Sequence, residues 1–243
     1  SSTQGMRGQT SRRSCECDRE YYLITSDEGL ANESLLCQTC PKGARCADDE
    51  CALRNEGFNC SDGSGIVGNW SKDDTGHYRL TSCPAGYELM TAQEMDSIDE
   101  QRCDRCSDNQ YIIDPDVDSC QKCPPGLVCQ GDATVQRVVE NSTWIRHQAG
   151  SSQVFKLVSC PSGYRRVSTD GDWELQECEP CGKGEECTNA TCITCAPCQP
   201  GYYKAAVSTD ACLACPADRY RETAGASDLG LCRKCQLKSS TQG

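Results

Sequence analysis

Residues 120–129 read Cys-Gln-Lys-Cys-Pro-Pro-Gly-Leu-Val-Cys, and this short stretch indicates how the whole chain folds. The proline after Cys123 presets the second position of a tight turn, and Gly126 at the fourth position allows the turn to close. The chain therefore reverses just after a cysteine, and each reversal begins a short hairpin. The same Cys-Pro-x-Gly unit recurs at Cys40, Cys83 and Cys160.

Cysteine dominates the composition of the chain around these turns. It fills 24 of the 243 positions, whereas there are only two Phe and three Met. A cysteine content near a tenth indicates a disulfide scaffold, in which covalent cross-links supply the stability that a small apolar core cannot. We therefore predict a small disulfide-rich fold: elongated tandem cysteine-rich modules with short β-hairpins and little helix.

Two long modules repeat the same order of residues. Each contains Cys-x2-Cys-Pro-x-Gly, then a Trp beside an Asn-x-Ser/Thr site, a second Cys-Pro-x-Gly-Tyr turn, and a closing Gln-x-Cys-x2-Cys that begins at Gln101 or Gln176. A shorter stretch up to Cys235 repeats only the Cys-x2-Cys rhythm. The predicted domains are a linker (1–14), module 1 (15–106), module 2 (107–181), short repeats (182–235) and a second linker (236–243).

Regular elements within the modules are expected to be few. The stretches Tyr111–Asp114 and Tyr202–Val207 are β-prone runs that end in polar turn residues. No stretch has a sustained apolar period of 3.6 residues, so we expect at most a brief helical turn between residues 92 and 102.

All of the cysteines are expected to form disulfides, although sequence alone leaves crossed pairings open. Closing the nearest loops predicts eight bridges: Cys17–Cys37, Cys40–Cys46, Cys83–Cys103, Cys106–Cys120, Cys123–Cys129, Cys160–Cys178, Cys198–Cys212 and Cys215–Cys232. Cys51 and Cys60 occur only in module 1 and are expected to pair with each other. A further group, Cys181, Cys187, Cys192 and Cys195, can pair within itself. Cys15 and Cys235 remain for a bridge between successive units.

Charge and hydropathy exclude several classes of partner. The net charge of −12 argues against a nucleic-acid partner, because binding to phosphates requires concentrated Lys and Arg. No run of about 18 apolar residues is present, so no direct membrane insertion is expected in this segment. Because no basic and apolar segment opens the chain at Ser1, we expect no export leader within this segment. We interpret the chain as a processed or excised piece of an extracellular or cell-surface protein.

Glycosylation motifs support this localisation. Five of the seven Asn residues are followed two positions later by Ser or Thr, where chance predicts about one. N-linked glycans are therefore expected at Asn32, Asn59, Asn69, Asn141 and Asn189.

The sequence motifs for metal or cofactor binding are weaker than the evidence for disulfides. The Cys-x2-Cys pairs would suit zinc in a reducing compartment, but glycosylation sites argue against such a compartment. The Gly63-Ser-Gly65-x2-Gly68 pattern lacks a preceding apolar strand, so we expect a flexible loop and no dinucleotide site. Asp114, Asp116 and Asp118 alternate as in a calcium loop, yet Ser119 and Pro125 replace its required Gly and Glu. We expect no cofactor; weak, incidental calcium binding is the alternative to a solvated acidic turn.

Catalysis has no obvious location in the sequence. His77 and His147 are the only imidazole bases, and both are expected on module surfaces. Trp70 and Trp144 occupy matching positions beside glycan sites. We expect them to fill the small apolar centres of their modules with Tyr78 or Phe155, and binding to a partner or a sugar is the alternative. We expect no enzyme activity.

The C-terminal part resembles a known repeat. Cys198-Gln-Pro-Gly-Tyr-Tyr, Cys212-x2-Cys215-Pro-Ala-Asp-Arg-Tyr and Cys232-x2-Cys235 are similar to the ephrin-receptor-like cysteine-rich repeat, a relative of EGF-like and TNF-receptor-like modules. The resemblance covers residues 195–235 and is looser over 37–181; Asp218 replaces the usual turn Gly. Such repeats occur in large secreted or cell-surface proteins, including long tandem proteins of algae and other protists. The resemblance therefore implies that this chain is a spacer or structural element of a protein of this kind.

A repeated pentapeptide suggests how such units are arranged. Ser-Ser-Thr-Gln-Gly occurs at residues 1–5 and again at 239–243, which is consistent with one period of a tandem array, although an artefact is the alternative. The first functional hypothesis is a structural glycoprotein unit of an extracellular fibre, sheath or flagellar-hair-like filament, whose partners are copies of itself joined head to tail. The second is a receptor or adhesion ectodomain that binds a protein ligand.

Overall fold

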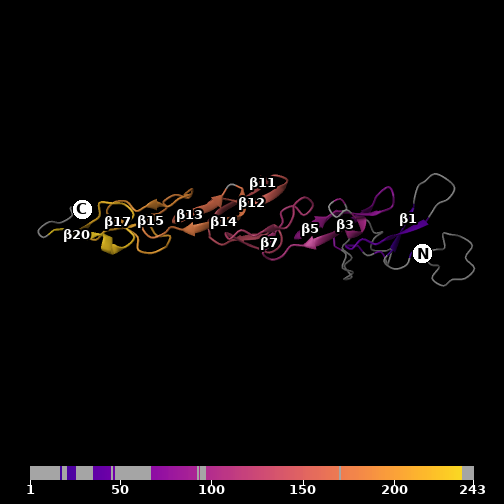
Figure 1. The fold of residues 1–243 in the computed structure, drawn as a ribbon, viewed down its shortest axis with the longest axis horizontal. Coiled ribbons are helices and arrows are strands. Elements are labelled where there is room, and N and C mark those ends of the chain that lie inside the picture. The colour runs from indigo at the N-terminus through magenta and orange to yellow at the C-terminus, as the bar shows by residue number, and fades with distance from the viewer. Residues whose placement is uncertain are drawn as a thin grey trace, which may run out of the picture. The chain divides into compact units, whose positions relative to one another are not determined.

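The computed structural model describes residues 17, 21–25, 35–44, 46, 67–91, 93, 97–169 and 171–236. Within these residues the strands form ten two-stranded sheets, nearly all of them short antiparallel hairpins, and the only helices are two single 3-10 turns (Figure 1). Ten disulfide bonds join cysteines of the same residues. The chain is therefore a small disulfide-rich fold.

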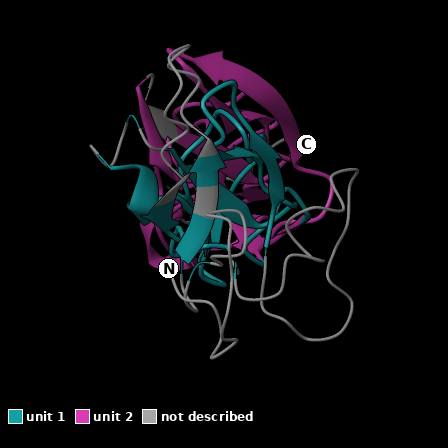
Figure 2. Cartoon of the chain, turned by 90° about the vertical axis from the view of Figure 1, so that its right-hand side faces the viewer, with its two compact units in different colours: residues 1–121, 130–134 teal, residues 122–129, 135–243 magenta. Residues whose placement is uncertain are grey.

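The chain divides into two compact units, coloured teal and magenta in Figure 2. Unit 1 comprises residues 1–121 with 130–134, and unit 2 comprises residues 122–129 with 135–243.

The hairpins follow one another in chain order, and each strand pairs with a close neighbour in the sequence. The first four pairs are β1 (Tyr21–Thr25) with β2 (Leu35–Thr39), β3 (Asn69–Lys72) with β4 (Tyr78–Ser82), β5 (Tyr87–Met90) with β6 (Arg102–Arg105), and β7 (Gln110–Tyr111) with β8 (Gln121–Lys122). The 3-10 turn η2 (Ile98–Glu100) lies in the stretch where a brief helical turn is predicted, and the Ser97 hydroxyl caps it by accepting the Asp99 N–H.

Unit 2 has the same kind of pairing. Its pairs are β9 (Leu127–Cys129) with β10 (Val135–Arg137), β11 (Thr143–Ala149) with β12 (Ser152–Ser159), β13 (Tyr164–Thr169) with β14 (Asp172–Pro180), β15 (Glu185–Glu186) with β16 (Ala196–Pro197), β17 (Tyr202–Tyr203) with β18 (Leu213–Ala214), and β19 (Arg219–Tyr220) with β20 (Arg233–Lys234). The second 3-10 turn is η3 (Leu229–Leu231).

Three of the turn glycines adopt the left-handed backbone geometry that glycine favours, whereas Gly43 and Gly126 do not. Gly86, Gly163 and Gly201 have φ of 86°, 88° and 85°. Asp218 stands at the equivalent position with φ of 62°, and Asp is among the residues that tolerate this left-handed region. The substitution of Asp for Gly therefore leaves the turn in place.

Two predicted strands are shorter than expected. The run Tyr202–Val207 forms a strand only over Tyr202–Tyr203, because Lys204 turns inward and becomes buried. In the run Tyr111–Asp114 only Tyr111 is in a strand, because Asp114 begins a turn in which its carbonyl accepts the N–H of Asp118 at 2.8 Å.

The core consists of small separate clusters that contain cystine sulfurs. In unit 1, Trp70 packs against buried Tyr22, Ile24, Cys46 and Tyr78, and the rings of Tyr22 and Tyr78 lie 4.7 Å apart. In unit 2, Trp144 packs against buried Leu157, Cys160 and Cys178. Both tryptophans are thus partly buried and pack against the apolar clusters of their modules, and the buried aliphatic partner of Trp144 is Leu157.

The disulfides close consecutive loops. The structure joins Cys17–Cys37, Cys40–Cys46, Cys83–Cys103, Cys106–Cys120, Cys123–Cys129, Cys160–Cys178, Cys198–Cys212 and Cys215–Cys232, the pairs given by nearest-loop closure. The other four pair as Cys181–Cys195 with Cys187–Cys192 nested inside. Cys15, Cys51 and Cys60 lie outside the described residues, and Cys235 has no disulfide partner among those that are described.

Candidate functional site

Backbone hydrogen bonds connect five of the turns to the cysteine that starts the next loop. The carbonyl of Gly163 accepts the N–H of Cys181 at 3.1 Å, and Gly184 accepts the N–H of Cys198 at 2.8 Å. The same bond recurs in three further repeats: Cys106 to Gly86, Cys215 to Gly201, and Cys235 to Asp218. The turn is therefore the joint of the repeat as well as a reversal of the chain.

The turn glycines also donate to the following repeat. The N–H of Gly184 donates to the carbonyl of Lys204 at 2.9 Å, and that of Gly201 donates to Arg221 at 2.8 Å. At Gly126 the approach is close: a Cβ atom there would lie 2.6 Å from Cζ2 of Trp144. Glycine is required at position 126 because there is no room for a side chain.

In two loops a glutamate carboxylate caps the backbone N–H of the cysteine that closes the loop. The Glu186 carboxylate accepts the N–H of Cys212 at 2.8 Å, and the Glu88 carboxylate accepts the N–H of Cys120 at 3.1 Å. Both glutamates stand two residues after a turn glycine. Sequence reasoning missed this cap, because the acceptor lies more than 20 residues from its donor.

A buried glutamine holds the β11–β12 hairpin of unit 2. Gln176 is 0% exposed, and its Oε1 accepts the N–H of Leu157 at 2.7 Å. Its Nε2 donates to the carbonyl of Phe155 at 2.8 Å and to that of Trp173 at 2.9 Å. The side-chain amide thus bonds the outer edge of β12 as a neighbouring strand would.

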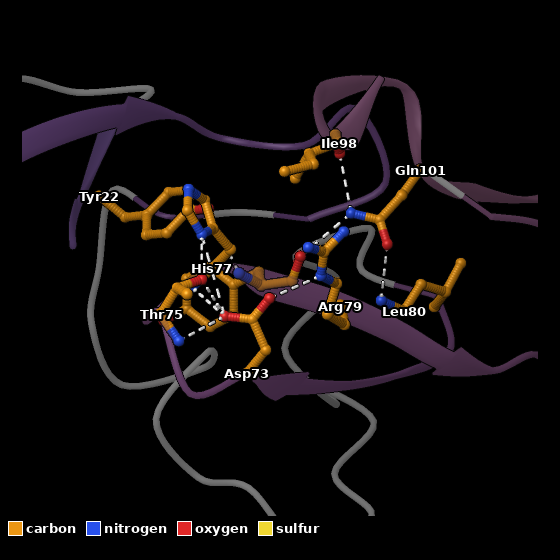
Figure 3. Close-up of polar contacts among 9 residues, drawn as sticks. Tyr22, Asp73, Thr75, His77, Arg79, Leu80, Ile98 and Gln101 are labelled. Carbon is orange, nitrogen blue, oxygen red and sulfur yellow. Dashed lines mark hydrogen bonds and ion pairs between the residues drawn. The ribbon is translucent and has the colours of Figure 1, made fainter. Parts of the chain in front are cut away.

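Gln101 forms the equivalent clamp in unit 1 (Figure 3). Its Oε1 accepts the N–H of Leu80 at 3.1 Å, and its Nε2 donates to Tyr78 at 3.0 Å and to Ile98 at 2.8 Å. The two glutamines recur in the sequence, but nothing local shows that each holds a hairpin about 20 residues away. The clamp is the feature that the repeat shares beyond its cysteines.

A carboxylate organises the turn between β3 and β4 (Figure 3). Asp73 Oδ1 accepts the Thr75 hydroxyl at 2.6 Å and the backbone N–H groups of Thr75 and His77 at 3.0 Å each. Asp73 Oδ2 accepts Nε of Arg79 at 2.8 Å. The hydrogen bond from Thr75, with those from Arg79 and His77, holds the pKa of Asp73 well below its ordinary value.

Replacing Asp73 by Asn is expected to loosen this turn by about 1 kcal/mol, because the charge that faces Arg79 is lost. A carboxyl whose pKa is lowered by folding stabilises fully above its unfolded-state pKa of about 3.9, and the contribution fades as the pH falls toward the folded-state pKa. Amide exchange at Thr75 and His77, corrected for intrinsic rates, should therefore show constant protection from about pH 7 to 5 and weaker protection below about pH 4.

The acid response should disappear in Asp73→Asn and persist in Asp74→Asn, the exposed neighbour. An unchanged acid response in Asp73→Asn would show that another group controls the turn.

Lys204 is a buried cation that connects successive repeats of unit 2. It is 4% exposed, and its Nζ donates to the carbonyls of Ser208 at 2.6 Å and Cys181 at 3.3 Å. Its backbone N–H donates to Ala226 at 3.0 Å. Backbone carbonyls thus replace water around the ammonium group. This role could not be predicted from the sequence, since Lys204 lies in a run typical of an exposed strand.

The acidic triplet uses its carboxylates as backbone acceptors. Asp114 Oδ1 accepts the N–H of Asp116 at 3.2 Å, and Asp118 Oδ2 accepts the N–H of Asp114 at 2.9 Å. Asp116 Oδ1 reaches the N–H of Cys83 at 2.9 Å. Across the described part of the chain, no group of three His, Cys, Asp or Glu residues is arranged to hold a metal ion.

Three predicted glycan sites lie on the surface of the described residues. Asn69, Asn141 and Asn189 are exposed, whereas Asn32 and Asn59 lie outside the described residues. Asn189 Oδ1 accepts the N–H of Thr191 at 3.1 Å, and Asn69 Nδ2 donates to the Ser82 hydroxyl at 2.7 Å. Of the glycine-rich pattern, Gly63 and Gly65 also lie outside the described residues.

The two histidines contact different kinds of neighbours. His77 lies in the Asp73 turn, with Nδ1 2.6 Å from the Thr75 hydroxyl. The ring of His147 lies 5.3 Å from that of Trp173, and Lys156 Nζ lies 5.7 Å from the same indole. Both histidines are partly buried.

A shallow pocket of about 80 Å³ lies beside β19 and β20 in unit 2. Its lining is Tyr220, Arg221, Glu222, Thr223 and Arg233. A pocket of this volume is well below the several hundred Å³ that a drug-sized ligand occupies.

The repeated joints, clamps and disulfides define a cysteine-rich repeat protein. Residues 186–232 match the tyrosine-protein kinase ephrin type A/B receptor-like family. Over 233 residues, 90% of this chain, the sequence is 23% identical to cysteine repeat modular protein A of Toxoplasma gondii, of which the alignment covers 6%. The chain therefore spans a small part of the length of the relative that it matches.

The disulfides also bear on the compartment in which the chain resides. Ten bridges in a chain of this size are typical of an oxidising, extracellular environment. Within the described residues no helix is long and apolar enough to cross a bilayer.

Proposed function

We propose that this chain is a glycosylated structural repeat unit of an extracellular fibre, sheath or flagellar-hair-like filament, with units following one another head to tail and no catalytic role. The observation that carries the proposal is the repeated joint, in which a turn residue accepts the N–H of the cysteine that opens the next loop. A contact that repeats without closing on itself generates a filament. Glycans on exposed Asn69, Asn141 and Asn189 would cover its surface.

Cys235 supports the continuation of this pattern into a further unit. Four earlier cysteines at this joint, Cys106, Cys181, Cys198 and Cys215, each form a disulfide 14 or 17 residues farther along the chain. Cys235 makes the same backbone bond, to Asp218 at 2.8 Å. If the repeated pentapeptide marks the period, Cys15 of the following unit would lie about 18 residues beyond Cys235.

We therefore expect a disulfide between Cys235 of one unit and Cys15 of the next. Peptide mass mapping without reduction, on a chain of two successive units, should yield one cross-linked peptide that contains both cysteines. Cys235→Ser in the first unit should remove this peptide and leave Cys215–Cys232 intact. A bridge from Cys15 to Cys17 or Cys37 within one unit would contradict the prediction.

The second candidate function is a receptor or adhesion ectodomain that binds a protein ligand, favoured by the receptor-like family match over residues 186–232. Electron microscopy of native material separates the two. A regular axial repeat commensurate with one unit supports the filament, whereas dispersed monomers with saturable binding of a protein ligand support the receptor.

A further inference from the structure

The disulfide pairing between Cys123 and Cys232 leaves one long stretch outside every disulfide loop. The bridges Cys123–Cys129 and Cys160–Cys178 flank residues 130–159, which contain no cysteine. On the C-terminal side, only two residues separate each loop from the next as far as Cys215–Cys232. The stretch holds strands β10, β11 and β12.

Tension along the chain acts differently on residues inside disulfide loops and on residues 130–159. A disulfide carries the load directly between its two cysteines, so the residues inside its loop are shielded and cannot lengthen. No disulfide bypasses residues 130–159, so these residues carry the load themselves. Fully extended, they would span up to about 105 Å. We propose that residues 130–159 form an extensible segment, which lengthens under tension while every disulfide stays intact. This goes beyond the proposed function, because it follows from the disulfide topology whether or not units form a filament.

The hairpin of the extensible segment is loaded at its open end. Thr143 at the start of β11 lies opposite Ser159 at the end of β12. Force that enters through Cys129 and leaves through Cys160 therefore separates the two strands from one end. Their hydrogen bonds are broken pair by pair, which requires less force than shearing all pairs together.

Contacts from shielded residues hold the extensible segment closed. Gln176, inside the Cys160–Cys178 loop, bonds Leu157 and Phe155 on β12, and Leu157 packs against both cystine sulfurs. At the other end, the N–H of Val138 donates to the carbonyl of Gly126 at 3.0 Å. Opening must break these contacts first, so we expect the segment to open as one event.

The test stretches the oxidised full chain by both ends in single-molecule force spectroscopy, using a matched pair of insertions. One variant carries ten Gly/Ser residues after Gly150, at the tip of the β11–β12 hairpin; the other carries the same insert after Gly171, at the tip of the β13–β14 hairpin. A Cβ atom at either glycine would meet nothing within 4 Å, so both turns have room for the insert. Only the insertion after Gly171 lies inside a disulfide loop.

We expect an opening step of at most about 105 Å of contour length in the parent chain. The insertion after Gly150 should lengthen this step by about 35 Å, and the insertion after Gly171 should leave every step unchanged. A step that lengthens with the insertion after Gly171, or no step that lengthens with the insertion after Gly150, would overturn the proposal. With disulfides reduced beforehand, both insertions should lengthen the total extension equally, which checks that both inserts are present.

Discussion

Gln176→Leu is expected to lower the free energy of unfolding of unit 2 by about 3–4 kcal/mol, although leucine nearly matches glutamine in size. The side-chain amide is fully buried and satisfies the N–H of Leu157 and the carbonyls of Phe155 and Trp173. Leucine can bond none of the three groups. Leaving a buried donor or acceptor unpaired costs about 1–3 kcal/mol each, and partial hydration of the Trp173 carbonyl reduces the sum.

Amide exchange at Leu157 gives a local measurement of this loss. The N–H that now bonds Gln176 should exchange roughly 150- to 700-fold faster in Gln176→Leu, since each 1.4 kcal/mol is about a factor of ten. Gln136→Leu, on exposed β10, is the matched control and should change stability by less than about 0.5 kcal/mol. Equal effects of the two substitutions would mean that Gln176 is only a space-filling residue.

The disulfide framework is the part of the fold that the sequence predicts best. Cys123 and Cys129 lie on either side of the Pro-Pro-Gly turn, so the nearest loop is also the one that the turn brings together. The same local logic predicts short hairpins and an absence of long helices. These inferences succeed because the interactions that determine them span few residues.

Features that depend on distant partners could not be predicted in this way. Gln101 and Gln176 recur in register, yet their acceptors and donors lie on strands about 20 residues away. Lys204 looks like an exposed strand residue until Cys181 and Ser208 are seen to present carbonyls to it. In both cases the polar side chain is buried because segments about 20 residues away in the sequence converge on it, and no local pattern encodes that convergence.

Removing the Cys160–Cys178 bridge by substituting both cysteines with Ala is expected to cost about 4 kcal/mol. A disulfide across an 18-residue separation restricts the unfolded chain by about 3 kcal/mol. Both cysteines are buried beside Leu157, so the lost sulfur atoms leave a cavity that adds about 1 kcal/mol. Removing Cys187–Cys192, whose separation is 5, should cost only about 2 kcal/mol. Denaturant unfolding of the oxidised variants, followed by tryptophan fluorescence, measures both values.

The same double substitution also tests, independently of stability, whether tension along the chain passes through the Cys160–Cys178 bridge. Without the Cys160–Cys178 bridge, the unshielded stretch grows from residues 130–159 to residues 130–180, because the next bridge begins at Cys181. The opening length under tension should then rise from at most about 105 Å to at most about 180 Å. Removing Cys187–Cys192 should leave that length unchanged, because its loop lies inside Cys181–Cys195 and is shielded with or without it. If both variants opened to the same length, the load would not follow the disulfides.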